Sequence, residues 1–111
     1  MTDAERQKAV VLREIDRGKD LLIAEQPTRG LDADAAADLR SRLMAVRNSR
    51  KAVLLLTGDP DEAMEMGDRI LVMRGGEIVA ELEPPYTTAR EVGLYMAGTS
   101  KQSEDMRYDD E

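Results

Sequence analysis

Residues 21–32 read LLIAEQPTRGLD, and this stretch decides the fold. Four apolar residues, 21–24, precede Glu25 and Gln26, and so short an apolar run is typical of a strand buried on both faces of a parallel sheet. Pro27 ends the strand, and Asp32 is a good N-cap for a helix over residues 33–48. Polar groups that follow such a strand lie at the carboxyl edge of the sheet, where parallel sheets bind ligands.

The segments around this stretch continue the alternation of helices and strands. Further helices are expected over residues 4–17, from Pro60 to near Gly67, and from Thr88 to Gly98, and further strands over residues 52–56, 70–73 and 78–82. Gly75-Gly76 suits a two-residue hairpin loop, and Thr88 with Glu91 has the spacing of a capping box. The order predicts an α/β fold: a layered, mostly parallel sheet flanked by helices, with an antiparallel hairpin attached.

The expected domain covers residues 1–98. Beyond it, residues 99–111 show no apolar periodicity and carry five acidic residues against Lys101 and Arg107. Such a composition cannot bury enough apolar surface to offset the entropy of ordering. We therefore predict a disordered acidic tail over residues 99–111.

Composition excludes several classes of function. The chain has 111 residues, 16 Lys and Arg against 23 Asp and Glu, a net charge of −7, and neither His nor Cys. Disulfides, imidazole or thiolate metal sites and histidine-activated nucleophiles are therefore excluded, and we expect no metal site. The scattered cations argue against nucleic-acid binding, which needs clustered Lys and Arg. No apolar run approaches about 18 residues and the start, MTDAERQK, is polar, so a soluble, cytoplasmic chain is expected.

The motifs together resemble the Walker B strand and D-loop of ATP-binding cassette (ABC) transporter ATPases. In that family, four apolar residues precede Asp-Glu-Pro-Thr and a short loop that ends in Leu-Asp. The sequence PTRGLD is most similar to the corresponding segment in the second cassette of importers for simple sugars and nucleosides. Across residues 6–98, Gln7-Lys8 resembles the end of the signature region, Asp32 matches the D-loop aspartate, and the Gly75-Gly76 hairpin resembles the one after the switch strand. Residues 91–98 resemble the end of these subunits.

This resemblance implies part of a P-loop NTPase fold and a place for the chain in transport. The chain would be the C-terminal part of an importer's ATP-binding subunit. ATP and Mg²⁺ would be the cofactors, and a second ATP-binding cassette and a transmembrane permease the partners. Such a subunit is peripheral to the membrane, on its cytoplasmic face.

Departures from the family pattern imply that the nucleotide site is degenerate. The sequence contains no GxxxxGK[ST] phosphate loop, and only Gln7 and Lys8 remain of the signature region. Glu25 stands at the place of the Walker B aspartate, Gln26 at that of the catalytic glutamate, and Gly58 at that of the switch histidine. We therefore expect that this chain alone neither binds ATP tightly nor hydrolyses it.

Simpler interpretations stand beside these. Glu25 and Gln26 also fit the polar end of an ordinary strand, and Asp32 fits a plain N-cap, a role that can coexist with the other. Met64 and Met66 fit core packing as well as a permease contact. The alternative function is a free-standing, non-catalytic α/β interaction domain.

Overall fold

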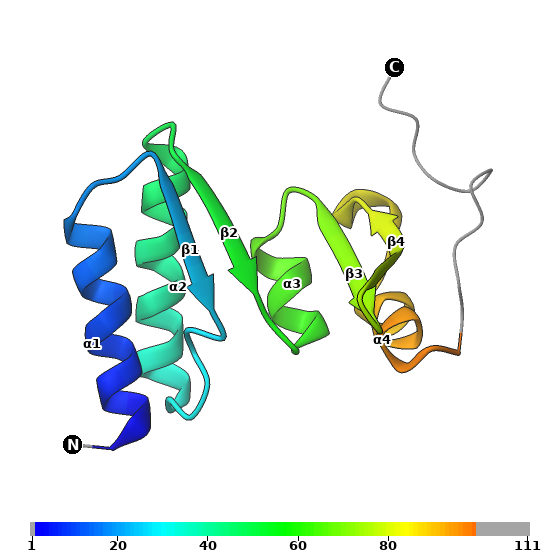
Figure 1. Cartoon of the computed structure of the whole chain (residues 1–111), viewed down its shortest axis with the longest axis horizontal. Helices are drawn as coiled ribbons and strands as arrows, with labels where there is room; N and C mark the ends of the chain where they lie inside the picture. Colours follow the sequence, from blue (N-terminus) through cyan, green and yellow to red (C-terminus); the bar gives the residue numbers. More distant parts are fainter. Residues whose placement is uncertain (1, 100–111) are drawn as a thin grey trace. The chain divides into compact units, whose positions relative to one another are not determined.

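The computed structural model describes residues 2–99. Its elements follow the predicted order of helices and strands and add one short 3-10 helix, η1 (Figure 1). They are α1 (Asp3–Asp16), β1 (Leu21–Glu25), α2 (Ala33–Asn48), β2 (Ala52–Leu56), α3 (Pro60–Met66), β3 (Ile70–Arg74), β4 (Glu77–Leu82), η1 (Pro84–Tyr86) and α4 (Ala89–Ala97). Of the predicted tail, Thr99 hydrogen-bonds to the carbonyl of Leu94, and the remainder lies outside the described residues.

Side-chain caps explain where the helices begin. Thr2 and Glu5 form a reciprocal capping box at the start of α1, and Asp59 accepts a hydrogen bond from the backbone N–H of Asp61 at the start of α3. The Thr88 hydroxyl accepts from the backbone N–H of Glu91, as predicted. The Glu91 carboxylate accepts from the hydroxyl of Thr87, one residue before the cap. The side chains of Thr2, Asp59 and Thr88 thus each satisfy a backbone donor in the first turn of a helix.

The chain divides into two compact units, Met1–Gly58 and Asp59–Glu111. In the first unit, β1 and β2 pair in parallel with Leu22 beside Val53. Helices α1 and α2 pack against each other and against the strands (Figure 1). The core of this unit consists of buried apolar side chains from both helices and from alternate positions of β1: Val11, Leu22, Ala24, Ala36, Leu39 and Leu43. Pro27, in the turn after β1, is also buried.

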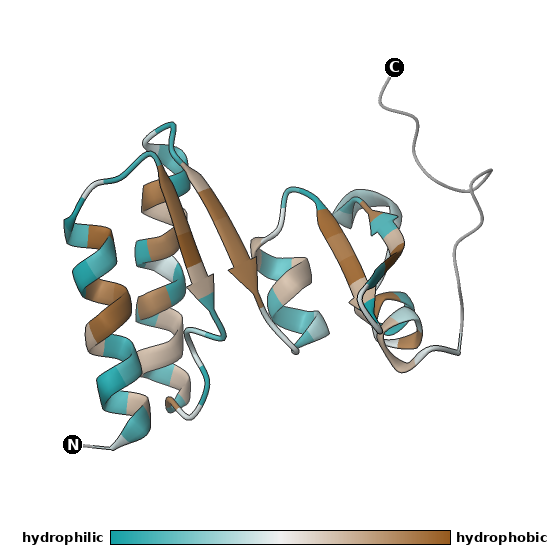
Figure 2. Ribbon diagram, in the orientation of Figure 1, coloured by the Kyte–Doolittle hydropathy of each residue, from teal (hydrophilic) through white to brown (hydrophobic). Residues whose placement is uncertain are grey.

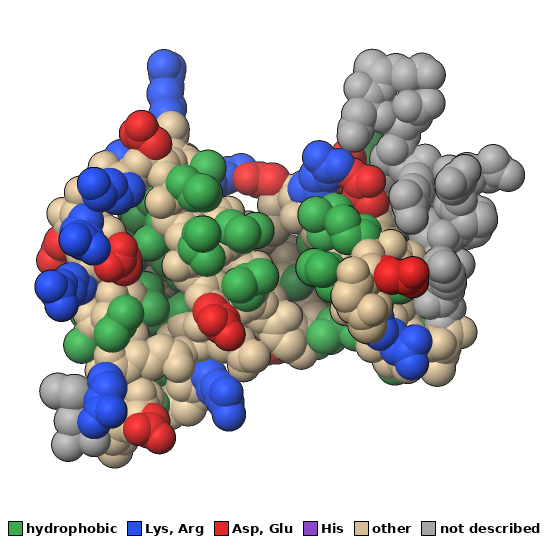
Figure 3. Space-filling model, viewed as in Figure 1, with side chains coloured by type: hydrophobic (Ala, Val, Ile, Leu, Met, Phe, Trp, Pro, Cys, Tyr) green, Lys and Arg blue, Asp and Glu red, His purple; other side chains and the backbone are tan. Residues whose placement is uncertain are grey.

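The prediction that residues 21–24 are buried on both faces is wrong. Leu22 and Ala24 are buried, whereas Leu21 is 53% exposed and Ile23 57% exposed. Both helices of this unit cover the same face, so alternate side chains on the other face have no covering layer within the described part of the first unit. Residues 21–24 and 52–56 are nevertheless apolar at every position, and β1 then ends in the acidic Glu25 (Figure 2). The space-filling view shows hydrophobic side chains gathered over these strands (Figure 3).

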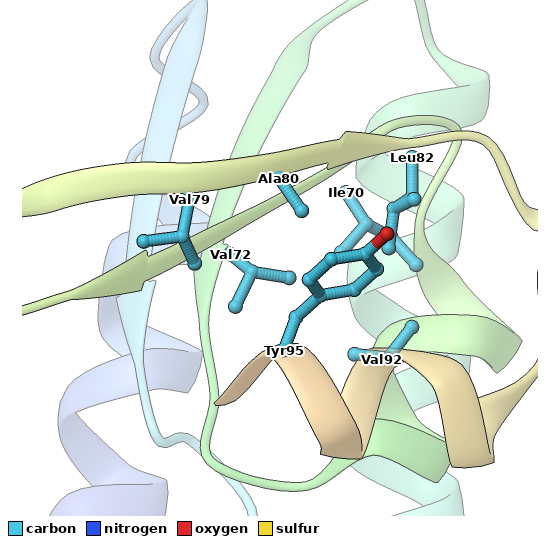
Figure 4. Close-up of a cluster of buried hydrophobic side chains, with 7 residues drawn as sticks. All are labelled: Ile70, Val72, Val79, Ala80, Leu82, Val92 and Tyr95. Atoms are coloured by element: carbon cyan, nitrogen blue, oxygen red, sulfur yellow. The ribbon is translucent and has the colours of Figure 1, made fainter. Parts of the chain in front are cut away.

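In the second unit, β3 and β4 form the predicted antiparallel hairpin. Gly75 and Gly76 both have positive φ, 60° and 79°, a conformation that glycine adopts without steric cost. A register shift between Val72 and Met73 interrupts the pairing. Side chains of β3, β4 and α4 form one buried cluster (Figure 4): Ile70, Val72, Val79, Ala80, Leu82, Val92 and Tyr95. Met64 packs against this cluster, which confirms a core role for that methionine.

The α/β class, the parallel strand pair and the antiparallel hairpin are confirmed, but a single, mostly parallel sheet is not. The structure pairs β1 with β2 and β3 with β4 in two separate two-stranded sheets. Within residues 2–99, β2 has a partner on one side only, so one of its edges is open. Periodicity identifies a strand but carries no information on which strands become neighbours.

We expect this chain to be marginally stable or self-associating. Two-stranded sheets rarely sustain a fold alone, and an open strand edge is a template for association. Thermal melting followed by circular dichroism, together with sedimentation, should show a broad or concentration-dependent transition. A monodisperse monomer that melts sharply above about 65 °C, the upper end for ordinary mesophile domains, would contradict this and favour a free-standing domain.

Candidate functional site

The residues at the ends of β1 and β2 lie at the carboxyl edge of the first sheet. Glu25 pairs in register with Leu56, the last residue of β2. The backbone N–H of Gln26 donates to the carbonyl of Leu56 at 2.6 Å, which extends the ladder by one residue. Gly58 follows Leu56 by two positions, and a Cβ built on it would meet no atom within 4 Å. Three of the predicted site positions, Glu25, Gln26 and Gly58, are therefore exposed at one edge of this sheet.

Gln26 has an unusual backbone conformation. Its φ is 42°, in the left-handed region that side chains other than glycine and asparagine rarely enter, at a cost of about 1–2 kcal/mol. The side-chain amide of Gln7 on α1 donates a hydrogen bond to the carbonyl of Gln26. Pro27, directly after Gln26, is buried. These contacts hold the turn in place, and they bring together two predicted site residues that are 19 positions apart.

A groove of about 310 Å³ lies between α1 and β1 in the first unit. Val10 and Val11 line it from the helix and Leu22 from the strand. Its polar lining comes from two carboxylates, a guanidinium and two side-chain amides: Glu14, Glu25, Arg29, Gln7 and Gln26. The amides can orient a polar ligand and the charged groups can pair with one. In residues 2–99, however, no loop of glycines that would cradle phosphate lines the groove.

Asp32 is the N-cap of α2, because its carboxylate accepts from the backbone N–H of Ala35 at 2.8 Å. This confirms the capping interpretation and leaves a D-loop role as a prediction. Lys8 follows Gln7 on α1 and is half-buried, but it is not among the residues that line the groove. The structure thus joins Gln7 to Gln26, and within the described part of the chain it gives no such contact for Lys8.

Two groove residues, Glu14 and Arg29, were not predicted to belong to a site. Glu14 lies seven positions after Gln7, and that spacing places both on one face of a helix. Arg29 is the cation of the PTRGLD loop, close in sequence to Glu25. Both signals were present, but nothing in the sequence shows that α1 lies along β1, and this packing is what makes the groove.

Metal and membrane features are absent from the part of the chain that the structure describes. Residues 2–99 contain no group of three or more acidic side chains arranged to hold a metal ion. Likewise, none of the described helices combines the length and apolar character that a membrane span requires.

Comparison with known proteins identifies the class of protein. No family model matches the chain. It is 46% identical over 102 residues to the guanosine import ATP-binding protein NupO of Bacillus subtilis. The aligned residues make up 92% of this chain and 20% of that relative. It is 43% identical over 98 residues to the nucleoside import ATP-binding protein NupA of Lactococcus lactis, an alignment that covers 88% of this chain and 19% of that relative. The glucose import ATP-binding protein TsgD13 of Haloferax volcanii is 42% identical over 92 residues, covering 83% and 17%.

These similarities agree with the resemblance seen in the sequence. The chain is homologous to part of the ATP-binding proteins of ABC importers for nucleosides and sugars. It spans about a fifth of the length of the relatives that it matches.

Proposed function

We propose that this chain is the C-terminal part of the ATP-binding protein of an ABC importer, of the type that takes up nucleosides or sugars, and that its nucleotide site is degenerate. The observation that carries the proposal is the alignment of about nine tenths of the chain with import ATP-binding proteins. The carboxyl-edge position of Glu25 and Gln26 supports it, because ligands of parallel sheets bind there.

The degenerate site follows from the chemistry of three side chains. Glu25, at the Walker B position, is one methylene longer than aspartate and so would place its carboxylate differently toward a Mg²⁺-bound water. Gln26 can orient a water molecule but cannot take its proton, and a lost general base is worth about 10²–10⁴-fold in rate. Gly58, at the switch position, has no side chain with which to contact a phosphate.

The remaining predicted site residues take supporting roles in this proposal. Asp32 is both the N-cap of α2 and the D-loop aspartate. Gln7, which would close the signature region together with Lys8, directs its amide to the carbonyl of Gln26. A signature helix linked in this way to the Walker B turn would transmit movement of one to the other.

Within a transporter, the chain would energise or regulate transport together with two other components. A second ATP-binding cassette would supply a complete phosphate loop, and a transmembrane permease would carry the substrate. The chain would then lie at the cytoplasmic face of the membrane as a peripheral subunit, with ATP and Mg²⁺ bound in the assembly.

Nucleotide binding should therefore be measured on the chain alone and then with its neighbouring permease and a full-length cassette. If the assembly binds no more nucleotide with the chain than without it, a role in the nucleotide site is wrong.

We expect that Gln26→Glu combined with Gly58→His does not restore hydrolysis in this chain. A general base and a switch residue have nothing to act on when no phosphate loop holds the nucleotide. The variant should fold, because Gln and Glu have the same shape and the space around Gly58 is open. Phosphate release should equal that of the unsubstituted chain and of buffer. Sustained release above both controls would show that the chain holds nucleotide in another way.

A non-catalytic interaction domain is the second candidate, and the uncovered apolar face of the first sheet favours it. The DNA upstream of the coding sequence separates the two. A phosphate-loop motif there, in frame or frameshifted, supports the transporter. Several hundred bases without one support the interaction domain.

A further inference from the structure

We propose that Gln7 is a positioning residue: its side-chain amide keeps Gln26 in the left-handed backbone conformation and thereby fixes the loop that joins β1 to α2. We call residues 26–31 the β1–α2 loop. The assignment concerns contacts inside the first unit, so it holds whether or not the chain takes part in transport.

The conformation of Gln26 is unfavourable for two separate reasons. Its φ of 42° lies in the left-handed region, which residues with a Cβ rarely enter. It also precedes Pro27, and a proline ring favours extended conformations for the residue before it. Such a conformation persists only where the surrounding structure imposes it. Without those contacts, Gln26 should return to the extended region.

Hydrogen bonds to both backbone groups of Gln26 hold this conformation. The N–H of Gln26 donates to the carbonyl of Leu56 at 2.6 Å. The carbonyl of Gln26 accepts from the side-chain amide of Gln7, and it also accepts from the backbone N–H of Arg29 at 3.2 Å. The bond from Gln7 comes from a side chain, so a substitution can remove it and leave the backbone groups unchanged.

The same face of α1 contacts the β1–α2 loop at a second point. Gly30 has a φ of 77°, and a Cβ built on it would lie 3.1 Å from the Cβ of Ala4. Ala4 and Gln7 are three positions apart, a spacing that places both on one face of a helix. The beginning of α1 therefore holds the loop at Gln26 and again at Gly30.

The β1–α2 loop determines where residues of the candidate site lie. Arg29 belongs to the loop and lines the groove between α1 and β1, and Asp32, directly after the loop, caps α2. A change of Gln26 from the left-handed to the extended region would redirect the chain that follows it, and the guanidinium of Arg29 with it. Through Gln26, Gln7 thus sets the position of a charged group of the groove.

Two opposite exchanges of amide and carboxylate on α1 test this assignment in the 111-residue chain. Gln7→Glu keeps the shape of the side chain and removes the amide donor. Glu14→Gln is the matched control, because it makes the reverse change seven positions later on the same helix face, where the side chain pairs with Arg17. The two variants therefore differ in whether the altered group contacts the β1–α2 loop.

Backbone NMR supplies two measurements on the loop. The Cα and Cβ chemical shifts of Gln26 report its φ, and hydrogen exchange of the Arg29 amide reports the turn that this amide closes. Gln7→Glu should shift Gln26 to extended values and speed Arg29 exchange by about two- to tenfold, the effect of one hydrogen bond. Glu14→Gln should change neither measurement.

A rescue variant separates positioning from a general contribution to folding. Glycine adopts positive φ without steric cost, so Gln26→Gly should hold the turn without help from α1. Adding Gln7→Glu to Gln26→Gly should then change Arg29 exchange by less than about twofold. If Gln7→Glu alone prevents folding, the double variant should regain the cooperative thermal transition of the Gln26→Gly chain.

Several results would overturn the assignment. One is a Gln26 whose shifts are extended in the unsubstituted chain, or left-handed in Gln7→Glu. Another is an equal effect of Gln7→Glu with and without Gln26→Gly, or a double variant that stays unfolded. The amide of Leu39, in the core of α2, serves as the reference for global stability. Faster exchange of Leu39 and Arg29 by the same factor would show that Gln7 merely stabilises the first unit.

Discussion

The 111-residue chain is expected to bind Mg-ATP with a dissociation constant no tighter than about 1 mM, a binding free energy of about −4 kcal/mol. Tight nucleotide binding depends on backbone N–H groups that converge on the phosphates, usually from a glycine-rich loop at the start of a helix. The sequence contains no such loop, and the groove between α1 and β1 has two carboxylates, Glu14 and Glu25, that would repel phosphate. Among the described residues that line this groove, only Arg29 carries a positive charge.

Isothermal titration calorimetry at millimolar ATP measures this directly, with Mg²⁺ alone as the baseline titration. Arg29→Ala is a useful second sample, because it should reduce whatever weak binding remains. A micromolar constant for the unsubstituted chain, which corresponds to about −8 kcal/mol, would show that some other arrangement of its residues holds the phosphates.

Leu39→Ala is expected to lower the free energy of unfolding by about 2–5 kcal/mol. The Leu39 side chain on α2 is fully buried, and truncating it removes apolar burial and leaves a cavity that its neighbours fill only in part. A domain of this size has little stability in reserve, so a loss of that size should unfold the first unit in much of the sample.

Val10→Ala is the control for this substitution. Val10 is 55% exposed on α1, and alanine has the higher helix propensity, so its effect should stay within about 0.5 kcal/mol. Urea unfolding followed by far-ultraviolet circular dichroism compares the two variants. Equal midpoints for Leu39→Ala and Val10→Ala would contradict the core that the structure assigns to the first unit.

Local signals account for the parts of the structure that were predicted well. Asp32 and Thr88 identify where α2 and α4 begin because each side chain satisfies a donor within its own first turn. Gly75 and Gly76 identify the hairpin because its turn needs positive φ at both positions. Such contacts span two to four residues, so a single sequence contains all that is needed to predict them.

The candidate site was predicted only in part, because some of its contacts join residues that are far apart in the sequence. The positions of Glu25 and Gln26 after an apolar strand indicated a sheet edge, and the register with Leu56 confirms that placement. The contact between Gln7 and Gln26, and the contribution of Glu14 to the groove, depend on how α1 packs against β1. No local pattern encodes that packing.

The sequence by itself determined the element order, the caps, the hairpin and the family to which the chain is homologous, because each of these depends on residue types at short, regular spacings. Only the tertiary structure decided which face of β1 and β2 is covered. The run from Leu21 to Ala24 is apolar at every position, so it has no alternation to distinguish an inner from an outer face. The buried face is the one on which α1 and α2 pack, and Leu21 and Ile23 are exposed on the other face.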